Sequence, residues 1–225
     1  MMTSAGSVLR DFSEPYLRRR YSILFYTLLL TMVAAPVLNA LKLSGILFEL
    51  LVAACLLAAV MPADAVRSRP FLLVLMIVVW LARPLTDWLG HRLLSVMTLG
   101  ISTLAGFLAA VAALRFAMGA TKVDGEHLYA ALSAYLLAGT CFGILYWVLE
   151  QINSGTFFVS GEFSQASAIY FSFVTLATLG YGDIAPRGDV ARGLAILEGV
   201  GGQLFLAVLV ARLVSLYSRS GNKSS

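Results

Sequence analysis

Long apolar runs dominate the hydrophobic pattern of this 225-residue chain, and short polar or turn-forming segments separate them. A helix that crosses a membrane needs about 20 mainly apolar residues. Six runs approach this length, so the pattern predicts six transmembrane helices. The runs are 21–41, 46–61, a short third run from residue 71 that Arg83 and Pro84 interrupt, 93–118, 128–151 and 190–217.

The segment 152–187, between the fifth and sixth runs, is less hydrophobic. Within it, residues 164–177 predict about four turns of helix, too short to span a membrane. We expect this helix to re-enter the membrane from one side, which is tolerated where protein or water surrounds it. The expected fold is an all-α membrane protein with six transmembrane helices and a re-entrant helix and loop between the fifth and sixth.

The composition supports a membrane location. Hydrophobic residues make up 60% of the chain and charged residues only 12%, whereas soluble domains carry roughly 25% charge. With both termini in the cytoplasm, eleven of the sixteen Lys and Arg residues fall on the inner side, as the positive-inside rule expects. The arginines before the first run therefore predict an interfacial, cytoplasmic anchor rather than a nucleic-acid site.

Catalytic groupings are absent from the sequence. His91 and His127 are far apart, and no nucleophile–base or metal-ligand spacing accompanies them. Cys55 and Cys141 both fall inside apolar runs, which favours buried free thiols over a disulfide or a metal site. We therefore expect neither an enzyme nor a resident cofactor.

The stretch from Thr175 to Asp183, Thr-Leu-Ala-Thr-Leu-Gly-Tyr-Gly-Asp, follows the predicted short helix. An extended chain can aim successive carbonyls at one axis only with unusual dihedrals, which Gly180 and Gly182 supply. Rings of such carbonyls replace the hydration shell of a potassium ion. The stretch resembles the selectivity filter of the tetrameric potassium channels of the pore-loop superfamily, closest to small prokaryotic members. The close match covers about 132–216.

The resemblance implies a role for each filter position, and a homotetramer, because one loop supplies a quarter of the carbonyl cage. Its filter residues are Thr178, Leu179, Gly180, Tyr181 and Gly182, with potassium ions held by the Thr178 hydroxyl and the carbonyls of the first four. Asp183 lies at the outer mouth. The implied partners are potassium ions, membrane lipids and three further copies of the chain. Leu179 replaces the commoner valine, and we expect selectivity to survive.

The last run carries further candidate residues. Counting from the filter, Gly202 falls on the family's hinge glycine, although Gly199 and Gly201 leave close helix packing as an alternative. Helical spacing then turns Gln203, Leu206 and Val210 toward the cavity. Glu198 is an acid inside the membrane, a default functional candidate. We expect it to bond to Thr175, Ser172 or backbone behind the short helix, with burial favouring its neutral form.

The first four runs resemble a voltage sensor only in number and orientation. The fourth has Arg92 before it and Arg115 near its end, with no Lys or Arg between them. These would sit about 35 Å apart along a helix, and move little charge through the membrane field. We therefore expect weak or no voltage dependence. The role of Glu49 in the second run stays open.

The predicted organisation has four parts. They are an interfacial cytoplasmic segment (1–20), a four-helix sensor-like domain (21–120), a pore domain (121–217) and a short cytoplasmic tail (218–225). The leading hypothesis is a passive potassium-selective channel. The alternatives are a weakly selective cation channel and a non-conducting accessory subunit. Phe171 and Phe173 resemble an aromatic cuff around the filter, but ordinary packing explains them equally well.

Overall fold

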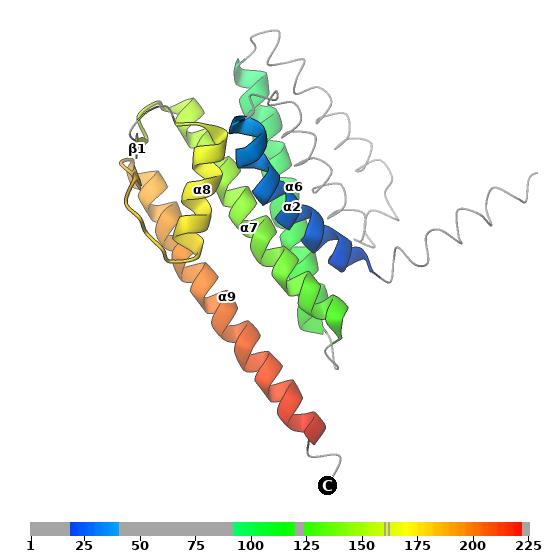
Figure 1. Cartoon of the computed structure of the whole chain (residues 1–225). Helices are drawn as coiled ribbons and strands as arrows, with labels where there is room; N and C mark the ends of the chain where they lie inside the picture. The colour runs from blue at the N-terminus through cyan, green and yellow to red at the C-terminus, as the bar shows by residue number, and fades with distance from the viewer. Residues whose placement is uncertain (1–18, 41–91, 120–123, 160, 162, 222–225) are drawn as a thin grey trace, which may run out of the picture.

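The computed structural model describes residues 19–40, 92–119, 124–159, 161 and 163–221. This part of the chain is almost wholly helical and contains five helices and two short strands (Figure 1). In chain order they are α2 (Arg20–Ala40), α6 (Arg92–Gly119), α7 (Gly125–Ile152), β1 (Phe157–Val159), α8 (Gln165–Leu176), β2 (Ile184–Pro186) and α9 (Asp189–Gly221).

The helices coincide with the predicted first, fourth, fifth and sixth runs and with the predicted short helix. Three of the described helices contain a stretch long and apolar enough to cross a membrane: Leu93–Gly119, Gly125–Ile152 and Asp189–Ser215. The predicted second and third spans, together with Glu49 and Cys55, lie outside the described residues. The chain is therefore a mainly helical membrane protein in the part that the structure describes.

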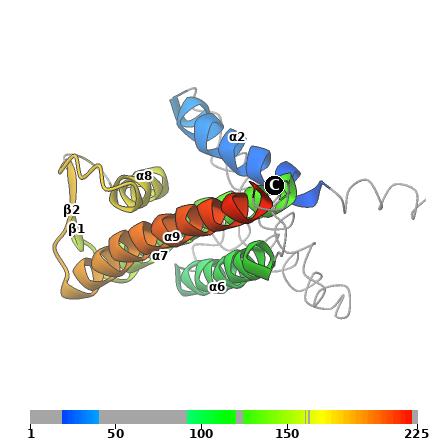
Figure 2. The same cartoon turned by 90° about the horizontal axis from the view of Figure 1, so that it is seen from below.

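Helix α7 is the centre of the described structure. It packs against α2, α6, α8 and α9, and the view from below shows α2, α6 and α8 arranged around α7 and α9 (Figure 2). Its buried positions are mainly small, including Ala130, Ala131 and Ala134, so neighbouring helices can approach closely. Gly139 and Gly143 lie further along the same helix.

The two ends of the bundle differ. At one end, the first residues of α2 and α7 meet the last turns of α6. Tyr21 stacks on Phe116 with ring centroids 4.7 Å apart, and Phe116 stacks on His127 at 4.6 Å. At the other end, α7 leads into β1, and β2 leads into α9. This arrangement places α8 and the loop after it at the end opposite the α2–α7 contact (Figure 1).

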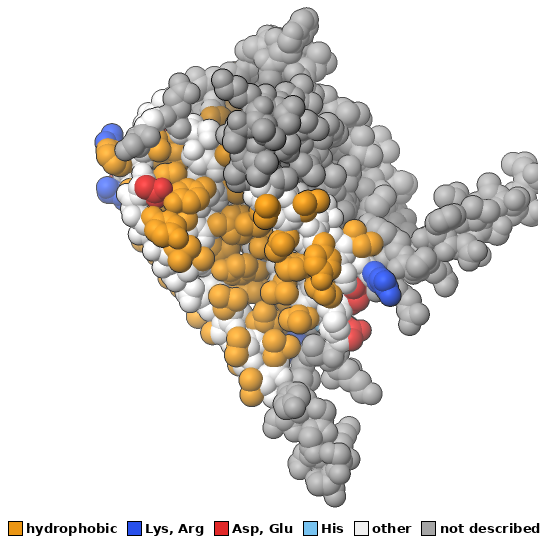
Figure 3. Space-filling model, viewed as in Figure 1, with side chains coloured by type: hydrophobic (Ala, Val, Ile, Leu, Met, Phe, Trp, Pro, Cys, Tyr) orange, Lys and Arg blue, Asp and Glu red, His pale blue; other side chains and the backbone are white. Residues whose placement is uncertain are grey.

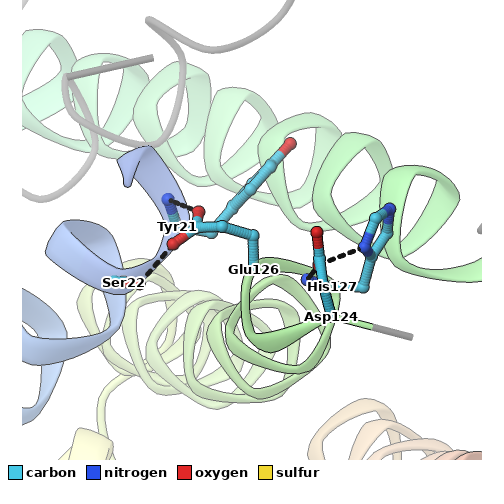
Figure 4. Close-up of polar contacts among 5 residues, drawn as sticks. All are labelled: Tyr21, Ser22, Asp124, Glu126 and His127. Carbon is cyan, nitrogen blue, oxygen red and sulfur yellow. Dashed lines mark hydrogen bonds and ion pairs between the residues drawn. The ribbon is translucent and has the colours of Figure 1, made fainter. Parts of the chain in front are cut away.

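Two carboxylates cap helices where α2 meets α7 (Figure 4). Asp124 caps its own helix by accepting a hydrogen bond from the His127 backbone N–H at 3.0 Å, and this bond lowers the pKa of Asp124 below its usual value. Glu126 instead accepts from the Tyr21 backbone N–H at 3.0 Å and from the Ser22 hydroxyl. A carboxylate at a helix N-terminus is favourable, so Glu126 fastens the start of α2 to α7.

The outer surfaces of α6 and α9 are apolar. Exposed side chains on α9 include Val190, Ile196, Leu197, Val200, Leu204, Val208, Val210 and Val214. Hydrophobic side chains cover much of the described face in Figure 3, and the charged ones that are visible lie mainly toward its two ends. Apolar patches of this extent face lipid or another protein surface.

Candidate functional site

Helix α8 is a short, well-capped helix that ends directly before the filter-like segment. The Ser164 side chain accepts the Ser167 backbone N–H at 3.1 Å and caps the N-terminus. Two glycines of α7 let α8 lie against it. A Cβ on Gly143 would come 2.6 Å from the Ile169 Cα, and one on Gly139 would come 2.7 Å from the Phe173 ring. The Gly-x-x-x-Gly spacing on α7 therefore fixes how close α8 lies.

Backbone hydrogen bonds hold the segment after α8 against the last turn of that helix. The Leu179 backbone N–H donates to the Val174 carbonyl at 2.9 Å, and the Thr178 N–H donates to the Thr175 carbonyl at 3.0 Å. From α7, the Tyr135 hydroxyl donates to the Leu176 carbonyl at 3.2 Å. The position of α8 thus sets the position of the segment's first residues.

The backbone of this segment takes the unusual dihedrals that the sequence predicts for its glycines. Gly180 has φ +55° and Gly182 has φ +80°. Thr178 also has a positive φ, +58°, which is an outlier for a β-branched residue. Strained backbone of this kind persists only where the surroundings enforce it, and it concentrates at functional sites.

Residues 177–183 are all exposed in the single chain. Leu179 is 56% exposed and Tyr181 66%. The Tyr181 ring lies parallel to the Tyr170 ring of α8 with centroids 6.5 Å apart. The ring therefore lies beside the short helix, and nothing in the described part of one chain covers the rest of it.

Asp183 bonds to a residue that the sequence reasoning missed. The Tyr170 hydroxyl donates to the Asp183 Oδ2 at 3.0 Å, so the aromatic residue beside the segment is Tyr170. Phe171 and Phe173 both pack against other residues of the same chain. Phe171 lies 5.1 Å from the Tyr146 ring and 5.4 Å from the Phe157 ring, and Phe173 faces Gly139.

A two-stranded ribbon holds the far end of the segment. β2 begins directly after Asp183 and pairs with β1 in antiparallel register, Val159 opposite Ile184. Glu150, at the end of α7, accepts the backbone N–H groups of Gly155 at 2.7 Å and Phe157 at 3.2 Å. The segment is thus held by α8 at one end and, through the ribbon, by α7 at the other.

Glu198 is buried between three helices, with 1% of its surface exposed. The Tyr146 hydroxyl of α7 donates to its Oε2 at 2.7 Å. Its Oε1 contacts the Ser172 hydroxyl of α8, which also lies 2.6 Å from the Gly139 carbonyl oxygen. Ser172 is one of the partners expected from the sequence, whereas Tyr146 was not anticipated.

The glycines of α9 have different surroundings. A Cβ on Gly202 would come 2.6 Å from the Leu176 Cδ1 and 3.2 Å from its carbonyl oxygen, whereas one on Gly201 would meet open space. Gly202 therefore has a packing reason to be glycine, and a hinge role stays a prediction. Of the predicted cavity residues, Gln203 and Val210 are exposed and Leu206 is partly buried.

Comparisons with known proteins point to one protein class. A family model described as "Ion channel" matches residues 130–219, from α7 through α9. The chain is 31% identical over 101 residues to Protein LctB of Bacillus caldotenax, covering 41% of this chain and 74% of LctB.

Two relatives carry potassium channel names. The inward rectifier potassium channel Kirbac3.1 of Paramagnetospirillum magnetotacticum is 33% identical over 89 residues, 38% of this chain and 28% of that protein. Two-pore potassium channel 3 of Arabidopsis thaliana is 31% identical over 87 residues, 39% of this chain and 18% of that protein. The match thus spans less than a third of either channel. Comparison with solved structures gave no significant match.

Proposed function

This chain belongs to the ion channel family, and from that premise we propose that it forms a potassium-selective channel that conducts passively across a cell membrane. Membership makes the protein a channel rather than an enzyme. The observation that carries the proposal is the segment 178–183, whose two glycines have positive φ and whose ends are both fastened to helices. Fixed carbonyls can replace the water around a potassium ion.

In the proposed channel, residues Thr178 to Gly182 form the filter and α8 is the re-entrant pore helix. Potassium ions bind to the Thr178 hydroxyl and to the carbonyls of the first four filter residues. The C-terminal end of α8, with its partial negative charge, favours a cation in the cavity below. Asp183 lies at the outer mouth, attracts cations and is held by Tyr170.

Four copies around one axis complete the proposed site, because one loop supplies a quarter of each carbonyl ring. The exposure of Leu179, Tyr181 and the apolar face of α9 supports this assembly. In a tetramer the same surfaces would contact neighbouring copies or line the pore, with Gln203, Leu206 and Val210 facing the cavity. Lipid would cover the remaining apolar face of α6.

The proposed topology has six spans with both termini in the cytoplasm. Helix α2 runs away from its contact with Glu126, and α6 runs back toward that end (Figure 1). This alternation is compatible with two further spans between them. Because α6 carries no Lys or Arg between Arg92 and Arg115, we propose that the channel has little voltage dependence.

Ion flux from liposomes reconstituted with the purified chain tests the proposal. We expect potassium flux that barium blocks, with much smaller sodium flux, under matched gradients. Flux should change little when the membrane potential is stepped. Equal sodium and potassium flux would instead indicate a weakly selective cation channel. Absence of flux from protein shown to be tetrameric would support the non-conducting accessory subunit.

Gly202 has two explanations, a hinge in α9 and close packing against Leu176, and substitutions can distinguish them. Gly202→Ala should destabilise the protein by about 1–3 kcal/mol, because its Cβ would overlap Leu176 in a well-packed contact. If packing is the cause, the penalty shrinks by about 1 kcal/mol or more in a Leu176→Ala background, since contacting residues are non-additive. Thermal unfolding of the four members of this cycle measures the difference.

Gly201→Ala is the matched control for the contact with Leu176, because it lies on the same helix and a Cβ there meets no described residue of its own chain. We expect it to leave stability unchanged or slightly improved, as alanine favours a helix over glycine. Equal penalties for Gly202→Ala in both backgrounds, together with lost flux, would contradict the packing explanation and favour a hinge.

A further inference from the structure

If the Glu198 side chain is ionised, its surroundings contain too few donor hydrogens for the contacts that the structure shows. The Ser172 hydroxyl has one hydrogen to donate, yet its oxygen lies within bonding distance of two acceptors, the Gly139 carbonyl and the Glu198 Oε1. A carboxylate and a backbone carbonyl are both acceptors only. With an ionised Glu198, one of the two contacts would therefore join two oxygens with no hydrogen between them.

A proton on the Glu198 Oε1 resolves the conflict. The acid O–H then donates to the Ser172 oxygen, and the Ser172 hydroxyl donates to the Gly139 carbonyl. The Tyr146 hydroxyl donates to the Oε2. Three hydrogens then serve three bonds, and every group in the chain of contacts is satisfied.

The surroundings of the group agree with this hydrogen count. Tyr146 and Ser172, like Glu198 itself, are almost completely buried. Both contacts of Glu198 are to neutral hydroxyl groups, and Tyr135 of α7 is a further neutral titratable group near enough to interact with it. Burying an ionised carboxylate among neutral groups is far more costly than burying a neutral acid.

We propose that Glu198 is held as a neutral carboxylic acid and acts as a positioning residue that fastens α9 to α8 and α7 behind the filter. This inference rests on the proposed function and assigns the acid an indirect part in selectivity. Ser172 lies in the same helix as Val174 and Thr175, whose carbonyls hold the first filter residues. The Glu198 contacts fix the rotation of α8, and that rotation sets where the filter begins.

Infrared difference spectroscopy of the full-length protein in liposomes tests the protonation directly, whether or not the protein conducts. Subtracting the spectrum of Glu198→Gln from that of the unsubstituted protein isolates one carboxyl group. We expect loss of the carbonyl stretch of a protonated acid. Loss of the two stretching bands of a carboxylate instead would overturn the proposal.

Glu150→Gln is the matched control. Both Glu150 oxygens accept backbone N–H groups, so its contacts need no proton on the carboxyl group. The same subtraction should show loss of carboxylate bands, which demonstrates that the method separates the two forms in this protein.

Flux measurements test the positioning role. In Glu198→Gln the introduced amide group can donate to Ser172 while its carbonyl accepts from Tyr146, so this variant should keep potassium flux and selectivity within about twofold. Glu198→Leu fits the space but leaves the Tyr146 hydroxyl without its acceptor and the Ser172 oxygen without its donor. We expect about a tenfold or larger loss of potassium-over-sodium selectivity. A glutamine variant as impaired as the leucine variant would overturn the neutral-acid role. If neither the unsubstituted protein nor Glu198→Gln conducts, the proposed function fails. The infrared result still decides whether Glu198 is protonated.

Discussion

Replacing Gly180 with alanine is expected to abolish potassium selectivity while each subunit keeps its fold. Gly180 has φ +55°, and an L-residue in this left-handed region costs roughly 1–2 kcal/mol. The nearest way to relieve that cost is to rotate the adjoining peptide, which turns a filter carbonyl away from the axis. In the proposed tetramer the change occurs four times around one ring, where carbonyls must replace the ion's hydration shell together.

The measurement is the ratio of potassium to sodium flux from liposomes, which we expect to fall toward one. Gly161→Ala is the matched control, because Gly161 has φ +118° and lies in the loop between β1 and α8, outside the contacts that hold the filter-like segment. It introduces a similar backbone cost away from the filter and should leave the flux ratio unchanged. Unchanged selectivity in Gly180→Ala would contradict the assignment of this segment as the filter.

The sequence predicted much of the described fold because its signals are local. The apolar runs predicted α2, α6, α7 and α9, and the shorter run before the Gly-Tyr-Gly motif predicted α8 to within a residue at each end. Apolar length and turn-forming residues act over a few helical turns, so no tertiary information was needed. The positive φ at Gly180 and Gly182 also followed from residue type alone.

The contacts that hold the segment were only partly predictable. Ser172 was among the partners expected for Glu198, because both face the boundary between two adjacent helices in any such arrangement. Tyr146 and Tyr170 were missed, since each reaches its carboxyl partner across a tertiary contact 52 or 13 residues away along the chain. The Tyr146 pairing depends on how α7 and α9 are rotated relative to each other, and the Tyr170 pairing depends on the path of the segment after α8. A single sequence specifies neither.

The Gly139–Gly143 pair was missed although its signal was present. Two glycines four residues apart on a membrane helix are typical of a close helix–helix contact, but close packing was expected only for glycines of α9. In the structure the α7 pair accommodates α8, whereas Gly201 of α9 meets nothing. Spacing alone does not distinguish these glycines, because it does not show which face of a helix is covered.

Adding one methyl group at Gly143 should be among the most damaging small substitutions in this protein. A Cβ there would lie 2.6 Å from the Ile169 Cα and 3.1 Å from its backbone nitrogen. Backbone atoms cannot rotate away as a side chain can, so α8 would have to shift as a whole. Overpacking costs about 1–3 kcal/mol and occasionally more, and we expect Gly143→Ala to reach or exceed the upper part of that range.

Two further alanine variants should show smaller effects than Gly143→Ala, and thermal unfolding and ion flux measure all three. Gly139→Ala meets the far edge of the Phe173 ring at 2.7 Å, and because a ring can tilt, the loss should be smaller. Gly100→Ala, on α6, meets none of the residues that the structure describes, and the helix preference for alanine should stabilise it slightly. Since α8 precedes and holds the proposed filter, selectivity should fall in the same order as stability. Equal stability of all three variants would show that α8 does not depend on this close contact for its position.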